Sequence, residues 1–181
     1  NNDLTNSCDM FILIVRKDFV MRLFKIKETK SFMEQLFLKD SFDSFNLVNA
    51  VIKTFCTYNI DGIYEKDFFK NSDIAENSSE KRYCKWSELR SSSFNLIKGH
   101  NTPLFMKFIF SVDLDILGDN IFIEDGIDSL TLTVRFDDNS LSITSAVNRT
   151  NFSPDKTIDN LWDKKAEEIL INSSLTFDEE S

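Results

Sequence analysis

Two short stretches of the chain carry basic residues that could bind phosphate groups. The stretch Arg22–Lys39 holds five Lys or Arg against two Glu, and Lys81–Lys98 holds five against one, although the whole chain carries −9. Basic residues segregated in this way favour an anionic partner, and contacts to phosphates would give salt-sensitive, sequence-independent binding of nucleic acid. The alternative is that these side chains only solvate two amphipathic helices. The candidate nucleic-acid-binding residues are Arg22, Lys25, Lys27, Lys30, Lys81, Arg82, Lys85, Arg90 and Lys98.

The acidic residues indicate a second chemistry, because paired carboxylates can cleave glycosidic bonds or hold a divalent metal ion. Neighbouring acids occur at Asp61/Glu65, Glu124/Asp125 and Asp137/Asp138. In a chain with 30 acidic residues such pairs arise by chance, and Asp137-Asp138 is more simply a hairpin turn. A metal-dependent hydrolase that uses acidic residues is therefore an alternative prediction without assigned residues.

The segment Asp113–Glu124 partly matches the spacing of a calcium-binding loop. Acids stand at the first, third and last positions and Gly118 at the sixth, but Leu117 occupies a position that needs an oxygen ligand. The flanking segments are typical of strands rather than of helices. We interpret the pattern as a chance resemblance and predict no metal site.

Other patterns of catalysis or cofactor binding do not occur in the sequence. His100 is the only histidine, and its loop Gly99–Thr102 offers no Ser or Cys partner for nucleophilic catalysis. The four glycines form neither a dinucleotide-binding fingerprint nor a P-loop. We therefore assign no catalytic residue and no cofactor, and we favour a protein that is not an enzyme.

The composition is typical of a packed intracellular protein. Hydrophobic residues make up 41 % of the chain. The apolar run Met10–Val15 is shorter than the roughly 20 residues of a membrane span, and it follows Asp9 rather than basic residues. The three cysteines are too widely spaced for a disulfide framework or a zinc ribbon, and Cys56 is expected to be a small core residue. We predict a cytoplasmic location without membrane contact.

The chain length favours one domain. We expect residues 1–20 to be an N-terminal extension, with Met21 as a natural start. Residues 21–172 should form a single α+β domain, and residues 173–181 a frayed acidic tail. Within the domain, the polar stretch Asn71–Glu80 is predicted to be a loop.

Periodicity predicts the elements of the first half. A strand at Met21–Ile26 precedes a helix at Thr29–Leu38, and Phe45–Ile60 is expected to be extended. The pair Asp61-Gly62 predicts a tight turn, after which Ile63-Tyr64 begins the return strand.

The second half repeats this order, and its basic stretch Lys81–Lys98 likewise begins with a strand-like entry before the helix. A helix at Trp86–Lys98 precedes strands at Leu104–Val112, at Leu130–Phe136 and, beyond a turn at Asp137–Ser140, from Leu141 to Val147.

A final helix is predicted after Ser153-Pro154-Asp155, with the proline just inside its start. Trp86 and Trp162 are expected to be core anchors. The fold-class prediction is α+β, with an antiparallel sheet built from two β-α-β-β-β halves plus a C-terminal helix.

The stretch Met21–Leu170 resembles an uncharacterised family of clostridial and related Firmicutes proteins, known only as a domain of unknown function. The resemblance is carried by Phe55, Ile60-Asp61-Gly62, Trp86, Leu89, Arg90, Leu96-Ile97-Lys98-Gly99, Thr102-Pro103 and Leu161-Trp162. It implies a bacterial cytoplasmic protein and no particular activity.

The two halves are also similar in architecture to one domain of a DNA sliding clamp. This likeness implies that paired helices face DNA with their basic residues, although a single domain would have to oligomerise to form a ring and the third helix is extra. The sequence thus predicts a non-enzymatic binding or interaction protein, with a protein partner or self-association. A clamp-like contact with nucleic acid through two basic helices is the first alternative.

Overall fold

The structure, a computed structural model, describes residues 22–69, 81–118 and 126–180. The predicted N-terminal extension, the predicted loop Asn71–Glu80 and the acids Glu124 and Asp125 lie outside the described residues.

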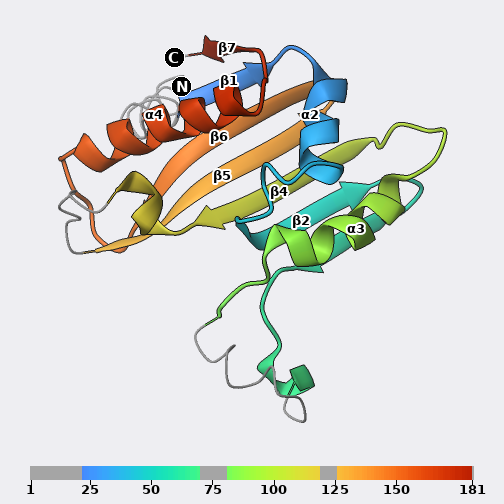
Figure 1. Ribbon diagram of the computed structural model, residues 1–181, viewed down its shortest axis with the longest axis horizontal. Helices are drawn as coiled ribbons and strands as arrows, with labels where there is room; N and C mark the ends of the chain where they lie inside the picture. The colour runs from blue at the N-terminus through green and yellow to red at the C-terminus, as the bar shows by residue number, and fades with distance from the viewer. Residues whose placement is uncertain (1–21, 70–80, 119–125, 181) are drawn as a thin grey trace, which may run out of the picture.

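The described residues form one antiparallel sheet with helices, so the predicted α+β class is confirmed (Figure 1). The strand order is β3-β2-β4-β5-β6-β1-β7. The strands are β1 (Arg22–Ile26), β2 (Asn46–Lys53), β3 (Thr57–Asp61), β4 (Phe105–Val112), β5 (Ile127–Asp137), β6 (Ser140–Arg149) and β7 (Phe177–Glu180). The helices are α2 (Thr29–Phe37), α3 (Trp86–Ile97) and the C-terminal α4 (Thr157–Asn172), with short 3₁₀ turns η1 (Lys66–Phe69) and η3 (Leu114–Leu117).

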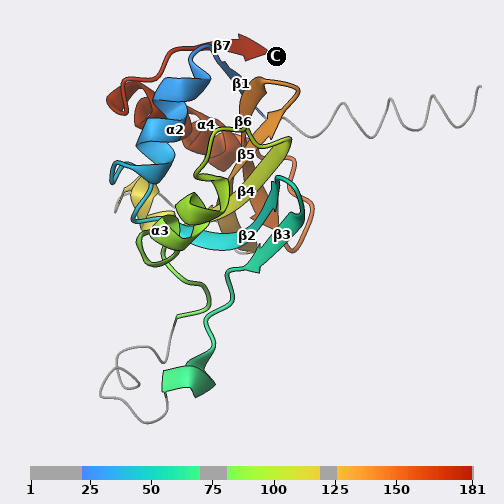
Figure 2. The same ribbon diagram turned by 90° about the vertical axis from the view of Figure 1, so that its right-hand side faces the viewer.

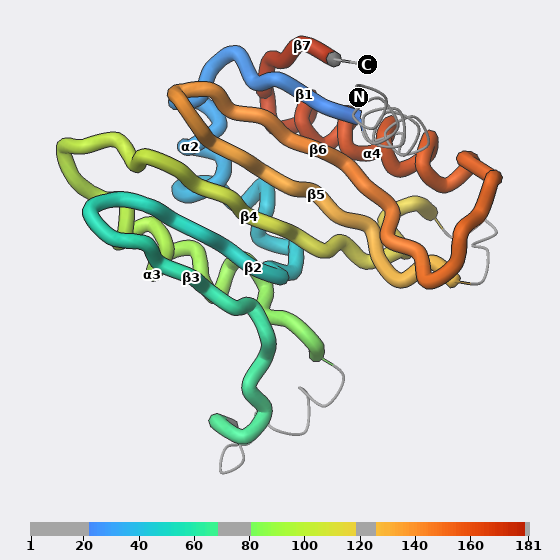
Figure 3. The backbone as a smooth tube through the Cα atoms, turned by 180° about the vertical axis from the view of Figure 1, so that it is seen from behind, coloured from blue at the N-terminus to red at the C-terminus, as the bar shows by residue number. Residues whose placement is uncertain are grey.

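The three α-helices lie on one face of the sheet (Figures 1 and 2). Side chains alternate between the two faces of a strand, and in β4 Met106, Phe108 and Phe110 are buried under the helices. The intervening Lys107 and Ile109 are half-buried and point to the opposite face. Seen from behind, no described helix covers that face, which we call the open face (Figure 3).

Both tryptophans are confirmed as core anchors, since Trp86 and Trp162 are fully buried. Each indole also uses its polar N–H, as buried tryptophans usually do. Trp86 Nε1 donates to the Leu36 carbonyl at 2.7 Å, and Trp162 Nε1 donates to the Thr131 carbonyl at 3.1 Å. The two side chains therefore fix α3 to α2 and α4 to the sheet.

The prediction of a tight turn at Asp61-Gly62 is wrong. The hairpin between β2 and β3 instead turns at Thr54–Cys56, where the Thr54 N–H donates to the Cys56 carbonyl at 2.9 Å. Cys56 is consequently exposed at this turn, and its predicted place in the core is also wrong.

Gly62 lies where the chain leaves β3 and crosses close to β2. Its N–H donates to the Val48 carbonyl at 3.1 Å, and its carbonyl accepts from the Cys84 N–H at 2.8 Å. Beyond it, Ile63 and Tyr83 form an isolated antiparallel bridge in place of the predicted return strand. The first half thus has two strands after its helix rather than three. Among the described residues, the predicted entry strand before α3 is replaced by isolated bridges at Tyr83 and Lys85, so the two halves repeat only in part.

We call residues 62–69 and 81–85 the arm. Its two segments pair through the Tyr64 N–H, which donates to the Arg82 carbonyl at 3.0 Å, and through the Gly62–Cys84 bond. The arm projects away from the sheet at the end of β3, beside the start of β2 (Figure 2). It continues directly into α3, which begins at Trp86.

The C-terminal segment differs from its prediction in two ways. Helix α4 begins at Thr157, so the predicted place of Pro154 just inside the helix is wrong. The Asp155 carboxylate accepts from the Thr157 N–H at 2.9 Å and satisfies that helix-end donor instead. The predicted fraying of the tail is wrong as well, because Phe177–Glu180 forms β7 beside β1.

The remaining predicted elements match the described residues closely. The turn between β5 and β6 is confirmed, with Asp138 and Asn139 at the positive φ angles that suit a two-residue hairpin. The predicted domain boundaries stay predictions. Within the described residues, no helix combines the length and apolar character that crossing a membrane would require.

Candidate functional site

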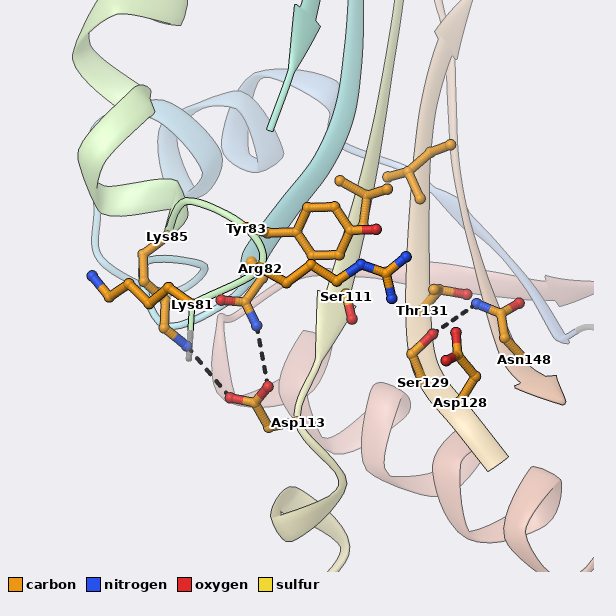
Figure 4. A pocket seen from close by; sticks show the side chains of 13 residues that line it. Lys81, Arg82, Tyr83, Lys85, Ser111, Asp113, Asp128, Ser129, Thr131 and Asn148 are labelled. Carbon is orange, nitrogen blue, oxygen red and sulfur yellow. Dashed lines mark hydrogen bonds and ion pairs between the residues drawn. The ribbon is translucent and has the colours of Figure 1, made fainter. Parts of the chain in front are cut away.

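A pocket of about 570 Å³ lies on the open face, where the arm meets the ends of the central strands. Figure 4 shows the side chains that surround it. The arm contributes basic and aromatic side chains, and β2, β4, β5 and β6 contribute mainly hydroxyls, amides and carboxylates. The lining residues are Asn46, Val48, Lys81, Arg82, Tyr83, Lys85, Ile109, Ser111, Asp113, Asp128, Ser129, Thr131 and Asn148.

Two lysines on the arm side of the pocket are held in place by nearby oxygens. Lys85 Nζ donates to the Ser44 carbonyl at 2.9 Å and lies 3.4 Å from a carboxylate oxygen of Asp113. Lys81 Nζ lies 3.5 Å from Glu88. Both ion pairs are partly exposed, so each contributes little to stability and its charges stay available to a ligand.

Arg82 is the least constrained cation of the pocket. Its guanidinium lies over the Tyr83 ring, 5.1 Å from the centroid, and forms no ion pair with a residue that the structure describes. Figure 4 shows the side chain extending from the arm toward the strand that carries Thr131. A guanidinium presents several donors in a planar fork that matches phosphate and carboxylate oxygens. The arm therefore offers a pre-positioned anion contact.

The opposite side of the pocket is built from β5 and β6 and is rich in acceptors. Asn148 Nδ2 donates to Ser129 Oγ at 3.0 Å, and Thr131 Oγ1 donates to the Ala146 carbonyl at 3.2 Å. Asp128 is exposed beside them and forms no ion pair with a described residue. Figure 4 shows Asp128, Ser129 and Asn148 grouped together, across the pocket from Lys81 and Lys85.

The structure brings only part of the predicted nucleic-acid-binding set together. Lys81, Arg82 and Lys85 line the pocket. Two others lie at the edge of the sheet, where Arg22 pairs with Glu167 and Glu179 and Lys27 pairs with Asp178.

The other four predicted residues are dispersed. Lys25 is exposed on the open-face side of β1, and Lys30 is exposed in the first turn of α2. Arg90 pairs with Asp43 at 2.9 Å and donates to the Lys39 carbonyl, while Lys98 is exposed at the end of α3. Helices α2 and α3 pack side by side. The role of all nine residues in binding stays a prediction.

Nothing in the described part of the chain supports the predicted hydrolase. Within it, no group of three or more His, Cys, Asp or Glu side chains could hold a metal ion. His100 is exposed in its loop. Of the calcium-loop pattern, Asp113 is engaged by Lys85 and by Asn46 Nδ2, which donates to it at 3.1 Å, and Glu124 lies outside the described residues.

A second group of charged side chains is buried between α4 and the sheet. Asp159 accepts two bonds from the Arg149 guanidinium, at 3.1 and 2.7 Å. Asp163 is 6 % exposed and accepts from Ser145 Oγ at 2.5 Å. Burial raises the pKa of Asp163, although the Ser145 bond and the nearby Arg22 act against this shift and Asp159 adds to it. This group packs α4 against β6.

The raised pKa of Asp163 predicts a pH-dependent contribution to stability. The folded protein holds this proton to a higher pH than the unfolded chain, where aspartate titrates near pH 3.9. The contribution is thus fully present below about pH 3.9 and is lost as the pH rises through the folded pKa. Asp163→Asn removes the titration and keeps an oxygen for Ser145. We expect the variant to gain stability relative to the parent as the pH rises from about 4 to 8.

Urea unfolding of parent and variant across this pH range measures the difference directly. Asp138→Asn, a change of the same kind at an exposed turn residue, is the matched control. A difference between parent and Asp163→Asn that stays constant with pH would contradict the prediction.

Sequence reasoning missed the acceptor side of the pocket. The apolar residues of each strand were used to predict the buried face, and the residues between them, which point to the open face, were not considered. In β5 the open-face positions hold Ser129, Thr131 and Thr133, and the last open-face position of β6 holds Asn148. A run of hydroxyl and amide side chains on every second residue is the signal that could have indicated a polar open face.

Comparisons with known proteins give a family but no activity. The family model DUF5721, described as a family of unknown function, matches residues 35–178, which is most of the chain. No curated protein and no solved structure matches the chain. The predicted bacterial origin and the likeness to a sliding clamp stay predictions.

Proposed function

Since the chain belongs to the DUF5721 family, whose function is unknown, we propose from the geometry that it is a non-enzymatic binding protein for a phosphate-bearing ligand. The proposed binding site is the pocket at the base of the arm. The observation that carries the proposal is Arg82, which reaches into the pocket toward the strand that carries Thr131 and forms no ion pair with a described residue (Figure 4).

The electrostatics of the pocket support this ligand class. Asp113 is paired with Lys85 and Glu88 with Lys81, so among the described residues Arg82 carries the unbalanced positive charge on the arm side of the pocket. Ser111 adds a hydroxyl near the path of the Arg82 side chain, whereas the Thr131 hydroxyl donates to the Ala146 carbonyl. A guanidinium without an ion pair among the described residues, with a neutral hydroxyl near it, favours an anion with several acceptor oxygens, as phosphate has.

The pocket is a better candidate for the binding of a phosphate-bearing ligand than the surface of helices α2 and α3. A clamp-like surface would need basic side chains gathered on α2 and α3. Arg90 instead pairs with Asp43, and Lys30 and Lys98 lie at the start of one helix and the end of the other. A protein partner or self-association, as the sequence predicts, is compatible with an exposed arm and stays a prediction.

Arg82→Gln is expected to weaken the binding of inorganic pyrophosphate by about tenfold or more, because a charge-assisted contact is lost. Isothermal titration calorimetry at low salt measures the dissociation constant. Arg135→Gln is the matched control, since Arg135 is an exposed arginine near the far end of β5 and pairs only with Asp137 among the described residues. It should bind pyrophosphate as the parent does.

Two results would contradict the proposal. One is a parent protein that does not bind pyrophosphate at low salt, and the other is an equal loss in the Arg82 and Arg135 variants. A generic DNA duplex serves as the second probe. Salt-sensitive duplex binding that Arg82→Gln leaves unchanged would favour the predicted helix surface over the pocket.

A further inference from the structure

The two sides of the pocket differ in charge, and this difference defines the ligand further. One side carries Arg82 together with Lys85, which pairs with Asp113, and Lys81, which pairs with Glu88, so this side keeps a net positive charge from Arg82. The other side carries Asp128, which has no ion pair with a described residue, with Ser129 and Asn148 (Figure 4). We infer that the pocket takes a sugar phosphate, with its phosphate against the arm and its hydroxyl groups against Asp128. This inference rests on the proposed function and adds the class of ligand.

Asp128 sets the orientation of the ligand. A carboxylate repels a phosphate group, so the phosphate is excluded from this side and directed to the cations. The same carboxylate has two oxygens that accept hydrogen bonds from neighbouring hydroxyls. A sugar phosphate carries both groups, an anion at one end and a row of hydroxyl donors at the other. Inorganic phosphate satisfies only one side.

Asn148 and Ser129 hold hydrogen-bond acceptors in place on the side of the pocket formed by β5 and β6. Asn148 Nδ2 donates to Ser129 Oγ at 3.0 Å, and this bond fixes the amide plane. The amide oxygen of Asn148 then remains to accept a second hydroxyl of the ligand. Both residues lie at neighbouring positions of the β5–β6 ladder, where Ser129 is the register partner of Asn148. The acceptors are therefore mounted on paired strands rather than on a loop.

The size and the apolar part of the pocket fit this class of ligand. A volume of about 570 Å³ exceeds what one phosphate fills and lies in the usual range for small-molecule sites. Val48, Ile109 and the ring of Tyr83 supply the apolar lining. They can cover the carbon skeleton of a sugar, or the base when the sugar phosphate is part of a mononucleotide. A free sugar phosphate and a mononucleotide both contain the sugar phosphate group that the pocket is inferred to bind.

Calorimetric titration of the full chain with four probes tests the inference. The probes are inorganic phosphate, inorganic pyrophosphate, ribose 5-phosphate and adenosine monophosphate. We expect ribose 5-phosphate to bind about tenfold more tightly than inorganic phosphate, because the hydroxyls add contacts to a charged acceptor. Tighter binding of adenosine monophosphate would identify a mononucleotide as the source, and equal binding a free sugar phosphate. Both results support the inference.

Asp128→Asn should abolish the tenfold preference for ribose 5-phosphate and leave pyrophosphate binding within about twofold of the parent. The matched control is Asp138→Asn, the same change in the same hairpin but at its far end. Thermal unfolding of both variants checks that neither change alters the fold.

The failures of the two proposals are distinguishable. If the parent binds pyrophosphate through Arg82 but binds ribose 5-phosphate no better than inorganic phosphate, the present inference is overturned and the proposed function stands. The same holds if Asp128→Asn keeps the preference. If the parent binds none of the four probes, both proposals are wrong.

Discussion

Replacing Gly62 with alanine is expected to lower the free energy of unfolding by about 3 kcal/mol, which corresponds to a melting temperature lower by roughly 10 °C. A Cβ atom at this position would lie 1.7 Å from the Leu47 carbonyl oxygen and 2.6 Å from its carbon. These are backbone atoms of β2, which cannot rotate away as a flexible side chain could. The added methyl group must therefore push the two segments apart.

The cost extends beyond the clash because Gly62 joins two hydrogen bonds. Its N–H donates to Val48 and its carbonyl accepts from Cys84, so a displaced Gly62 weakens the attachment of the arm. The same variant should therefore also impair the pocket, because Lys81, Arg82 and Lys85 lie in the arm segment that pairs with Gly62 and Tyr64.

Gly99→Ala is the matched control for this prediction, since a Cβ there would have no atom within 4 Å. We expect its stability to stay within about 0.5 kcal/mol of the parent. Chemical denaturation of the three proteins gives the comparison. Equal stability of Gly62→Ala and Gly99→Ala would show that β2 and the arm do not approach as closely as described.

Trp86→Ala is expected to destabilise the protein by about 4 kcal/mol, which lies in the usual range for removing a large buried aromatic side chain. The indole is fully buried and makes edge contacts with Phe37, Phe108 and Phe110, at centroid distances of 5.8, 5.4 and 5.5 Å. The rings belong to α2 and β4, which are too firmly packed to close the resulting cavity. The melting temperature should fall by roughly 12 °C.

Trp86→Phe separates packing from hydrogen bonding at this position. Phenylalanine keeps most of the aromatic contact but leaves the Leu36 carbonyl without the indole donor. Its cost should therefore be about half that of Trp86→Ala. Phe152→Ala, which removes an 82 % exposed ring, is the surface control and should be nearly neutral. A loss at Trp86 no larger than at Phe152 would contradict the burial of Trp86.

The sequence could predict only one side of the candidate site. The cations of the arm side are visible in the sequence as a basic stretch, whereas the polar residues of β5 and β6 form no local pattern of that kind. Lys81, Arg82 and Lys85 were selected by their charge, which is visible in any short window of an acidic chain. Asp128 and Asn148 were missed because each is ordinary by itself. They acquire meaning only when β5 and β6 pair, because Ser129, the neighbour of Asp128 in the chain, is then the register partner of Asn148.

Gly62 is a second example of a residue whose role depends on contacts that are distant in the sequence. The dipeptide Asp61-Gly62 is a common turn signal, and local reasoning can only interpret it as a turn. Its actual role depends on Leu47, a residue 15 positions earlier in the chain, whose carbonyl leaves no space for a side chain. The need for a glycine was visible in the sequence, whereas the cause was not.

The sequence by itself determined the α+β class, the helices at residues 29–37 and 86–97, and which face of β4, β5 and β6 is buried. These features follow from side-chain periodicity, which acts over a few residues. Only the tertiary structure decided the strand order, the attachment of β7 to β1 and the pocket. Each of these joins residues far apart in the chain, from Asn46 to Asn148 in the pocket, and such pairing is selected by the packing of the whole sheet rather than by local pattern.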